Sequence, residues 1–301
     1  MDTKTRLLIM YRGFKAPEKV IAINVAIFLV MIVFNAIYYL FNEYPSSIFR
    51  DIFALPADLG DFIVKPWTFI TYGFVHGGFW HLLFNCIGLY FTGRIFMYYF
   101  TEKQFITVYA YGIFAGAAIF LTAYNVFPAL ANQPILYFLV GASGGVVAIT
   151  IAGATYAPNL VVNLFGVLPV KYWIIGLLLT ISYIASIQGG TNVGGNFAHL
   201  GGAFIGYFYI KRIQKGSDIG IGFERFLERL VSYFTPKKKS PLKTVYKNKE
   251  KKRSTTKRTA TQTASEKQRK IDAILDKISK SGYESLTKAE KDFLFKAGKE
   301  N

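Results

Sequence analysis

The chain has 301 residues, of which 52% are hydrophobic, 17% aromatic and only 18% charged. This composition excludes an ordinary soluble domain and indicates a multi-span membrane protein. The net charge of +17 is uneven, because residues 211–301 hold 25 basic against 11 acidic side chains, a net +14. Between Gln104 and Ile210 the only formal charge is Lys171. We therefore expect that stretch to lie mostly in lipid.

The first apolar run, residues 20–41, is too long for the core of a signal peptide and lacks a small-residue cleavage site after it. It is interpreted as a retained membrane span. Cys86 is the only cysteine, so an intramolecular disulfide and a cysteine-based zinc site are both excluded.

A membrane-spanning helix needs about 20 apolar residues. The hydropathy pattern predicts an all-α fold with six spans, at residues 20–41, 81–100, 104–126, 143–157, 171–187 and 196–213. The fourth and fifth are short, which predicts that neighbouring helices shelter them. The result is a six-helix transmembrane bundle.

Basic residues flank both ends of the bundle. They are Lys4, Arg6, Arg12, Lys15 and Lys19 before the first span, and Lys211, Arg212 and Lys215 after the sixth. Positive charge in short flanks predicts the cytoplasmic side, so both termini are expected there. An even number of spans is consistent with that orientation.

The chain is expected to divide into five parts. They are a cytosolic segment at 1–19, the six-span domain at 20–213, an amphipathic interfacial helix at 217–235, a basic disordered linker at 236–265 and a small helical hairpin at 266–301. Within the last part, Thr287 and Glu290 predict a capping box that opens the second helix.

The chemistry concentrates at Ser143, which lies between glycines in Gly141-Ala142-Ser143-Gly144-Gly145. Glycines allow close backbone approach, and the amides at a helix start favour a developing negative charge. The same small residues could instead serve only tight helix packing. His199 favours the first interpretation, because an imidazole among apolar neighbours needs a hydrogen-bond partner such as a serine hydroxyl.

Glycines and further donors support this hypothesis. Gly202 and Gly206 lie on the same helical face as His199 and are expected to let its helix press against the helix of Ser143. His81 and Asn85, four residues apart, share one helical face and could donate hydrogen bonds to an oxyanion, or could bond only loop backbone.

Other chemistries fit less well. His76 is expected to be structural, and His76 with His81 lacks the ligands of a zinc site. No acidic residue occurs from 103 to 217, which excludes a Ser-His-Asp triad. A Ser143–His199 dyad remains, with a purely structural His199 as the alternative, and no cofactor or metal is expected.

These motifs together resemble the rhomboid family of intramembrane serine proteases. The resemblance covers about residues 15–213 and depends on His76-x4-His81-x3-Asn85, Gly141-x-Ser143-Gly144 and Ala198-His199-x2-Gly202-x3-Gly206. It implies that Ser143 is the nucleophile, that His199 is the general base and then acid, and that His81, Asn85 and the Ser143 amide form the oxyanion site. The loop containing Trp67 resembles the membrane-inserted loop of the family.

The resemblance also implies substrates and location. Peptide bonds in or beside transmembrane segments of membrane proteins would be cleaved, by a multi-pass protein of a bacterial plasma membrane. The basic tail is expected to contact anionic lipid headgroups rather than nucleic acid. The alternatives are an inactive rhomboid-like protein that binds transmembrane helices, or a proton-linked transporter that uses His199.

Three positions depart from the family pattern. Thr68 stands where many members have arginine, Met97 where glutamate is common, and Val147 where an aromatic residue often stacks on the histidine. These substitutions concern the anchoring of the Trp67 loop and the positioning of His199. The proposed nucleophile, base and oxyanion donors are all present.

Overall fold

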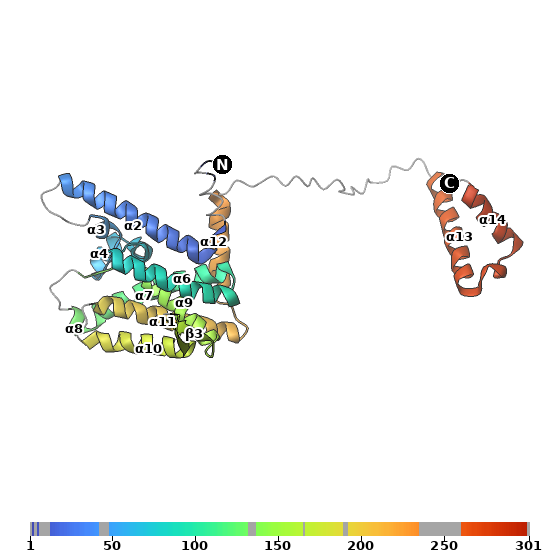
Figure 1. Cartoon of the computed structure of the whole chain (residues 1–301). Coiled ribbons are helices and arrows are strands. Elements are labelled where there is room, and N and C mark those ends of the chain that lie inside the picture. The colour runs from blue at the N-terminus through green and yellow to red at the C-terminus, as the bar shows by residue number, and fades with distance from the viewer. Residues whose placement is uncertain are drawn as a thin grey trace. The chain divides into compact units, whose positions relative to one another are not determined.

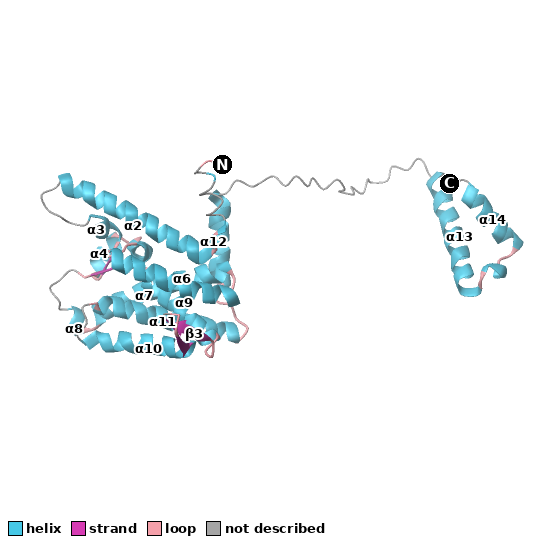
Figure 2. Ribbon diagram, viewed as in Figure 1, coloured by secondary structure: helices cyan, strands magenta, loops and turns pink. Residues whose placement is uncertain are grey.

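A computed structural model describes residues 2, 5, 13–41, 48–131, 137–164, 166–188, 192–234 and 260–299. The chain divides into two compact units, residues 1–237 and 238–301, which are described separately. Figure 2 shows that the described residues are predominantly helical.

Six helices form the body of the first unit. They are α2 (Ala16–Phe41), α6 (Phe79–Tyr99), α7 (Glu102–Val126), α9 (Ser143–Tyr156), α10 (Tyr172–Ala185) and α11 (Val193–Gln214). Each coincides with one of the six segments predicted from the sequence. The first helix begins four residues earlier than predicted, because Pro17 suits the first turn of a helix, where its missing N–H removes no hydrogen bond.

By length and composition, two of the described helices could cross a membrane, α2 and α7. α6 and α11 are long enough but less apolar, since they carry the polar residues of the predicted site. α9 and α10 are apolar but shorter.

The centre of the bundle consists of α7, α9 and α11, which pack against one another at glycines (Figure 1). A Cβ added to Gly112 of α7 would lie 2.6 Å from the carbonyl oxygen of Gly144 on α9. A Cβ on Gly202 or Gly206 of α11 would overlap the carbonyl oxygen of Gly144 or Ala148, respectively. The predicted close approach of the His199 helix to the Ser143 helix is therefore confirmed.

The outer helices are α2, which packs on α6, and α10, which packs on α9 and α11 (Figure 1). The prediction that neighbours shelter the short fourth and fifth spans holds for α9, in which ten of 14 residues are buried. It is wrong for α10, where only Tyr172 and Gly176 are buried. The reason is position: α10 lies at one edge of the bundle and exposes most of its aliphatic side chains.

Short elements occupy the connections of the first unit. They are α3 (Ile48–Phe53), β1 (Leu55–Pro56), α4 (Leu59–Val64), α5 (Thr68–Thr71), η1 (Tyr72–Phe74), α8 (Pro128–Ala131), β2 (Phe138–Leu139), β3 (Val161–Leu164), β4 (Leu168–Lys171) and η2 (Ser186–Gln188). β1 pairs with β2, and β3 with β4, both antiparallel. The described residues are mostly helical, in agreement with the predicted class, but these two short strand pairs were not predicted; Gly166, with φ of 76°, permits the hairpin turn between β3 and β4.

After the bundle, α12 (Ile221–Phe234) runs across the direction of the bundle helices (Figure 1). It begins four residues later than the predicted interfacial helix, because the preceding residues form a turn around Asp218. The Asp218 carboxylate accepts hydrogen bonds from the Tyr209 hydroxyl (3.0 Å), the Gln104 amide (3.2 Å) and the Gly220 N–H (2.7 Å). This turn attaches α12 to α7 and α11.

The second unit is described from α13 (Ala260–Ser281) through η3 (Tyr283–Ser285) to α14 (Lys288–Lys299). α13 begins six residues before the predicted hairpin, since alanine, threonine and glutamine extend the helix into the end of the predicted linker. The rest of that linker lies outside the described residues. Glu290 accepts from the Thr287 N–H (2.8 Å) and hydroxyl (2.9 Å), and its own N–H donates to Thr287 Oγ1 (3.4 Å). The predicted capping box is therefore present.

Candidate functional site

Ser143 is the first residue of α9, and its position leaves nearby amides available. The residue before it, Ala142, makes no side-chain hydrogen bond to the helix. Because the first N–H groups of an α-helix have no partner within the helix, the amides at Ser143 and the following glycines face outward from the helix start. These amides and the helix dipole favour a negative charge at this point.

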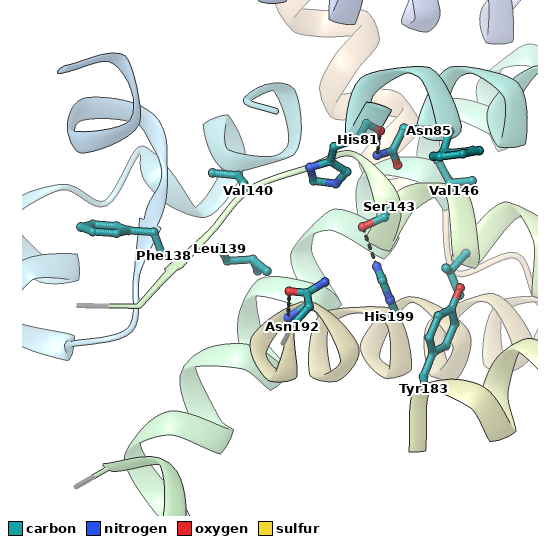
Figure 3. Close-up of a pocket in the computed structure, with 13 residues that line it drawn as sticks. His81, Asn85, Phe138, Leu139, Val140, Ser143, Val146, Tyr183, Asn192 and His199 are labelled. Carbon is teal, nitrogen blue, oxygen red and sulfur yellow. Dashed lines mark hydrogen bonds between the residues drawn. The ribbon is translucent and has the colours of Figure 1, made fainter. Parts of the chain in front are cut away.

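His199 lies in the second turn of α11 and points at Ser143 (Figure 3). Its Nε2 atom is 2.7 Å from Ser143 Oγ. Asn192 caps the N-terminus of α11, since its side chain accepts from the Gly195 N–H at 3.2 Å. The residues of the predicted dyad are thus within hydrogen-bond distance, although they are 56 positions apart in the chain.

The other ring nitrogen of His199 has no comparable partner. A neutral imidazole that accepts the Ser143 proton at Nε2 carries its own hydrogen on Nδ1. Nδ1 is buried, and no described residue hydrogen-bonds to it. A ring contact is present instead: the centroid of Tyr183 on α10 lies 4.4 Å from that of His199, with 49° between the ring planes.

His81, in the first turn of α6, faces Ser143 from the opposite side of the site (Figure 3). The Gly77 N–H donates to His81 Nδ1 at 3.3 Å. Because Nδ1 accepts, the proton of the neutral ring is on Nε2, which makes Nε2–H a hydrogen-bond donor. That edge of the ring lies against Gly141, where an added Cβ would be 2.6 Å from Nε2.

Asn85 has a hydrogen-bond donor available in the site, whereas His76 makes a ring contact with His81. Asn85 is 7% exposed and donates one amide hydrogen to the His81 carbonyl at 2.8 Å, so its second amide hydrogen remains for another acceptor. His76 is buried, and its ring packs edge-on against His81 with centroids 5.2 Å apart. Burial, together with the nearby His81, lowers the pKa of His76 to about 4. His76 is therefore neutral, and its contribution to the site is the ring contact with His81.

A cavity of about 490 Å³ joins these groups. It is lined by His81, Phe84, Asn85, Phe138, Leu139, Val140, Ser143, Val146, Val147, Tyr183, Asn192, Gly195 and His199. The residues preceding α9 and those opening α11 both contribute, so the cavity lies at the end of the bundle where those helices start. Its size is in the range of ligand-binding cavities, and its polar groups converge on Ser143 from two sides.

The Trp67 loop is attached through backbone acceptors. Trp67 Nε1 donates to the Ile52 carbonyl (2.9 Å), and Thr71 Oγ1 donates to the Phe53 carbonyl (2.8 Å). Thr68, at the position where an arginine is common in the resembled family, is fully buried and donates to the Lys65 carbonyl at 2.6 Å. This loop is thus anchored without an arginine at position 68.

Two residues of the site were missed in the sequence. Gly77 could have been found, because it is a glycine next to His76 and four residues before His81. Tyr183 carries no local signal, since it is one aromatic residue in an apolar helix. Of the other two departures, Met97 is half-buried and packs against the core, and Val147 is buried with Ile151 and Ala203.

The chain was compared with known proteins. The sequence model of the Rhomboid domain matches residues 64–215, and a family of unknown function (DUF6576) matches residues 261–297. RHOMBOID-like protein 12, mitochondrial, from Arabidopsis thaliana is 30% identical over 147 residues, which cover 46% of this chain and 44% of that protein. The chain therefore matches less than half the length of this relative.

Proposed function

The chain belongs to the rhomboid family and is accordingly an integral membrane protein, and from that premise we propose that it is an intramembrane serine endopeptidase. The observation that carries the proposal is the 2.7 Å distance between Ser143 Oγ and His199 Nε2 inside the cavity. No carboxylate activates the pair, because the cavity lining contains no aspartate or glutamate and no described residue hydrogen-bonds to His199 Nδ1. The pair acts as a dyad on peptide bonds in or next to transmembrane segments.

In the first step, Ser143 Oγ attacks the carbonyl carbon of the scissile peptide bond while its proton passes to His199 Nε2. The carbonyl oxygen becomes an oxyanion. His81 Nε2–H, the free amide hydrogen of Asn85 and the Ser143 N–H are the donors for it, on the wall of the cavity opposite His199. Each donor of this kind typically contributes about a hundredfold or more in rate.

In the second step, the C–N bond breaks, and the Nε2 proton of His199 goes to the leaving amine. The product is an ester between Ser143 Oγ and the N-terminal part of the substrate. A water molecule then gives one proton to His199 Nε2 and attacks the ester carbonyl, and that proton returns to Ser143 Oγ when the carboxylic acid leaves. Water enters through the cavity, whose polar residues tolerate it at membrane depth.

The proposal extends to six membrane spans, α2, α6, α7, α9, α10 and α11, with both termini in the cytoplasm. Basic residues at both ends of the bundle support it, and so does α12, whose transverse direction and exposed Phe226 and Val231 suit a helix at the membrane surface. The basic residues after α12 attract anionic lipid headgroups. The partners are then transmembrane substrates and the bilayer of a bacterial plasma membrane.

Two variants test the mechanism with a model transmembrane substrate in liposomes. Ser143→Ala and His199→Ala are each expected to abolish cleavage while the thermal unfolding transition in detergent stays within a few degrees of wild type. A fluorophosphonate probe is expected to label wild type at Ser143 and neither variant. Undiminished cleavage by either variant contradicts the dyad, and a wild-type protein that neither cleaves nor is labelled supports the non-catalytic, helix-binding alternative.

A further inference from the structure

Within the part of the chain that the structure describes, only one ring nitrogen of His199 is held by a hydrogen bond, the one between Nε2 and Ser143 Oγ, so a further contact is needed to fix the ring orientation. Rotation of the imidazole about its side-chain bonds would move Nε2 away from Ser143, and in serine proteases a buried carboxylate on Nδ1 prevents this. Here Nδ1 is buried without a hydrogen-bonding partner among the described residues. The nearest acidic positions in the sequence, Glu102 and Asp218, lie outside the cavity lining.

Tyr183 lies where it can supply the missing restraint. Its ring centroid is 4.4 Å from that of His199, at the short end of the range for contacting aromatic rings. It also packs against the buried cluster of Val147, Ile151 and Ala203, which holds the tyrosine ring in turn. His199 thus lies between the Ser143 hydroxyl and the tilted ring of Tyr183 (Figure 3).

The surroundings of Tyr183 indicate that this contact is specific to one side chain. Among residues 181–186 of α10 and the turn after it, Tyr183 is half-buried and the other five are exposed. Its neighbour Ile184 is 55% exposed. Of the residues of α10, all of which the structure describes, Tyr183 alone lines the cavity.

We propose that Tyr183 is the positioning residue for His199: its ring fixes the imidazole plane so that Nε2 faces Ser143, the function that a carboxylate has in a triad. This inference rests on the proposed function, because it concerns the base of the same reaction. The ring, rather than the hydroxyl, carries the effect, since no hydrogen bond from the hydroxyl to His199 is present. A consequence is that the alignment of His199 depends on how α10, a helix at the edge of the bundle, packs against α9 and α11.

The test compares five variants with wild type in steady-state cleavage of a transmembrane substrate, and the last two of them are Tyr183→Ala alone and Tyr183→Ala combined with Val147→Phe. Tyr183→Phe keeps the ring and is expected to retain kcat within about threefold. Tyr183→Leu keeps apolar volume without a ring and is expected to lower kcat by about 10- to 100-fold with KM little changed, as a displacement of about 1 Å in a reacting group does. Ile184→Ala is the matched control on α10 and is expected to behave as wild type.

The fifth variant separates positioning from packing. Val147→Phe combined with Tyr183→Ala moves the aromatic ring to the other wall of the same cluster, and it is expected to restore most of the kcat that Tyr183→Ala alone loses. Equal kcat in Tyr183→Leu and wild type, or loss in Tyr183→Phe equal to that in Tyr183→Leu, overturns the proposal.

A crystal structure of Tyr183→Leu gives a readout that needs no activity. The His199 ring is expected to rotate and the Nε2 to Ser143 Oγ distance to exceed hydrogen-bond range; an unchanged ring overturns the proposal even if the enzyme is slow. Failure of the proposed function gives a different result from failure of the Tyr183 proposal. In that case wild type itself neither cleaves nor is labelled at Ser143, while the ring position in the variant still decides the role of Tyr183.

Discussion

Gly141→Ala is expected to impair catalysis through His81, a residue 60 positions away in the sequence. Gly141 has φ of 116°, a conformation that favours glycine, and its N–H donates to the Tyr72 carbonyl at 2.9 Å, which holds it there. A Cβ at this position would lie 2.6 Å from both Cε1 and Nε2 of His81, whereas ordinary contact begins at 3.4 Å. The imidazole must therefore retreat by about 0.8 Å, or the backbone must shift.

The magnitude follows from those two effects. A displacement of about 1 Å in a group at the reacting centre can reduce the rate about 100-fold, similar to the loss of one oxyanion donor. The strained backbone costs a further ~1–3 kcal/mol of stability, because alanine does not readily adopt a positive φ. We expect kcat to fall by about 30- to 300-fold and the unfolding temperature to fall by several degrees.

A double-mutant cycle with His81→Ala checks the cause. Each single change is expected to lower kcat by about 100-fold. In the double variant, the methyl group of residue 141 meets no imidazole, so kcat is expected to fall by about 100-fold rather than by the product of the two effects. Losses that multiply in the double variant refute the explanation, because Gly141→Ala would then act independently of His81.

Two further predictions concern stability. Gly202→Ala is expected to lower the unfolding temperature sharply, because the added Cβ overlaps the backbone of α9. The control Gly222→Ala lies on α12, where nothing is within 4 Å of an added Cβ, and is expected to raise stability slightly. Equal effects of the two substitutions contradict the role of Gly202 in helix packing. The Lys277 ammonium lowers the pKa of Glu290 to about 2, below the ~4.3 of an unfolded chain. The ionised Glu290 carboxylate therefore stabilises the folded second unit fully above about pH 4.3, and this stabilisation is lost as the pH falls towards 2. The measurement is amide hydrogen exchange of the second unit, corrected for intrinsic rates. Amide protection is expected to fall over that pH interval in wild type and in the control Asp276→Asn, but much less in Glu290→Gln. Equal pH dependence in all three proteins contradicts the role of the Glu290 carboxylate.

The helices of the bundle could be predicted because their signal is local. Each is a run of apolar residues, and the pairing of Ser143 with His199 follows from their glycine context and from the need of an imidazole among apolar neighbours for a hydrogen-bond partner. The prediction failed for elements that are too short to carry a periodic pattern. The β3–β4 hairpin consists of two four-residue strands, too short for periodicity to distinguish them from a connection.

The different exposure of α9 and α10 was not predicted, because shelter by neighbouring helices was inferred from their short length and not from the size of their side chains. α9 and α10 have the same length and similar apolar character, yet α9 is central and α10 is at the edge. The difference lies in side-chain size: the glycines and alanines of α9 allow neighbours on all sides, whereas leucine and isoleucine dominate α10. Tyr183 could not be assigned for the same reason, since its role depends on which side of α10 meets α11.

The glycine contacts between helices also explain how two residues on separate helices keep a fixed distance without an ion pair. Gly144, next to Ser143, presents its carbonyl oxygen to Gly202, which is three residues and almost one turn after His199. The backbones therefore touch directly beside the dyad, and no flexible side chain separates them at that level. A contact between backbones varies less than one between long side chains, because no rotamers are involved. In a site where a buried carboxylate would carry a large desolvation penalty, close backbone packing sets the Ser143 to His199 distance, and an aromatic ring is left to set the orientation.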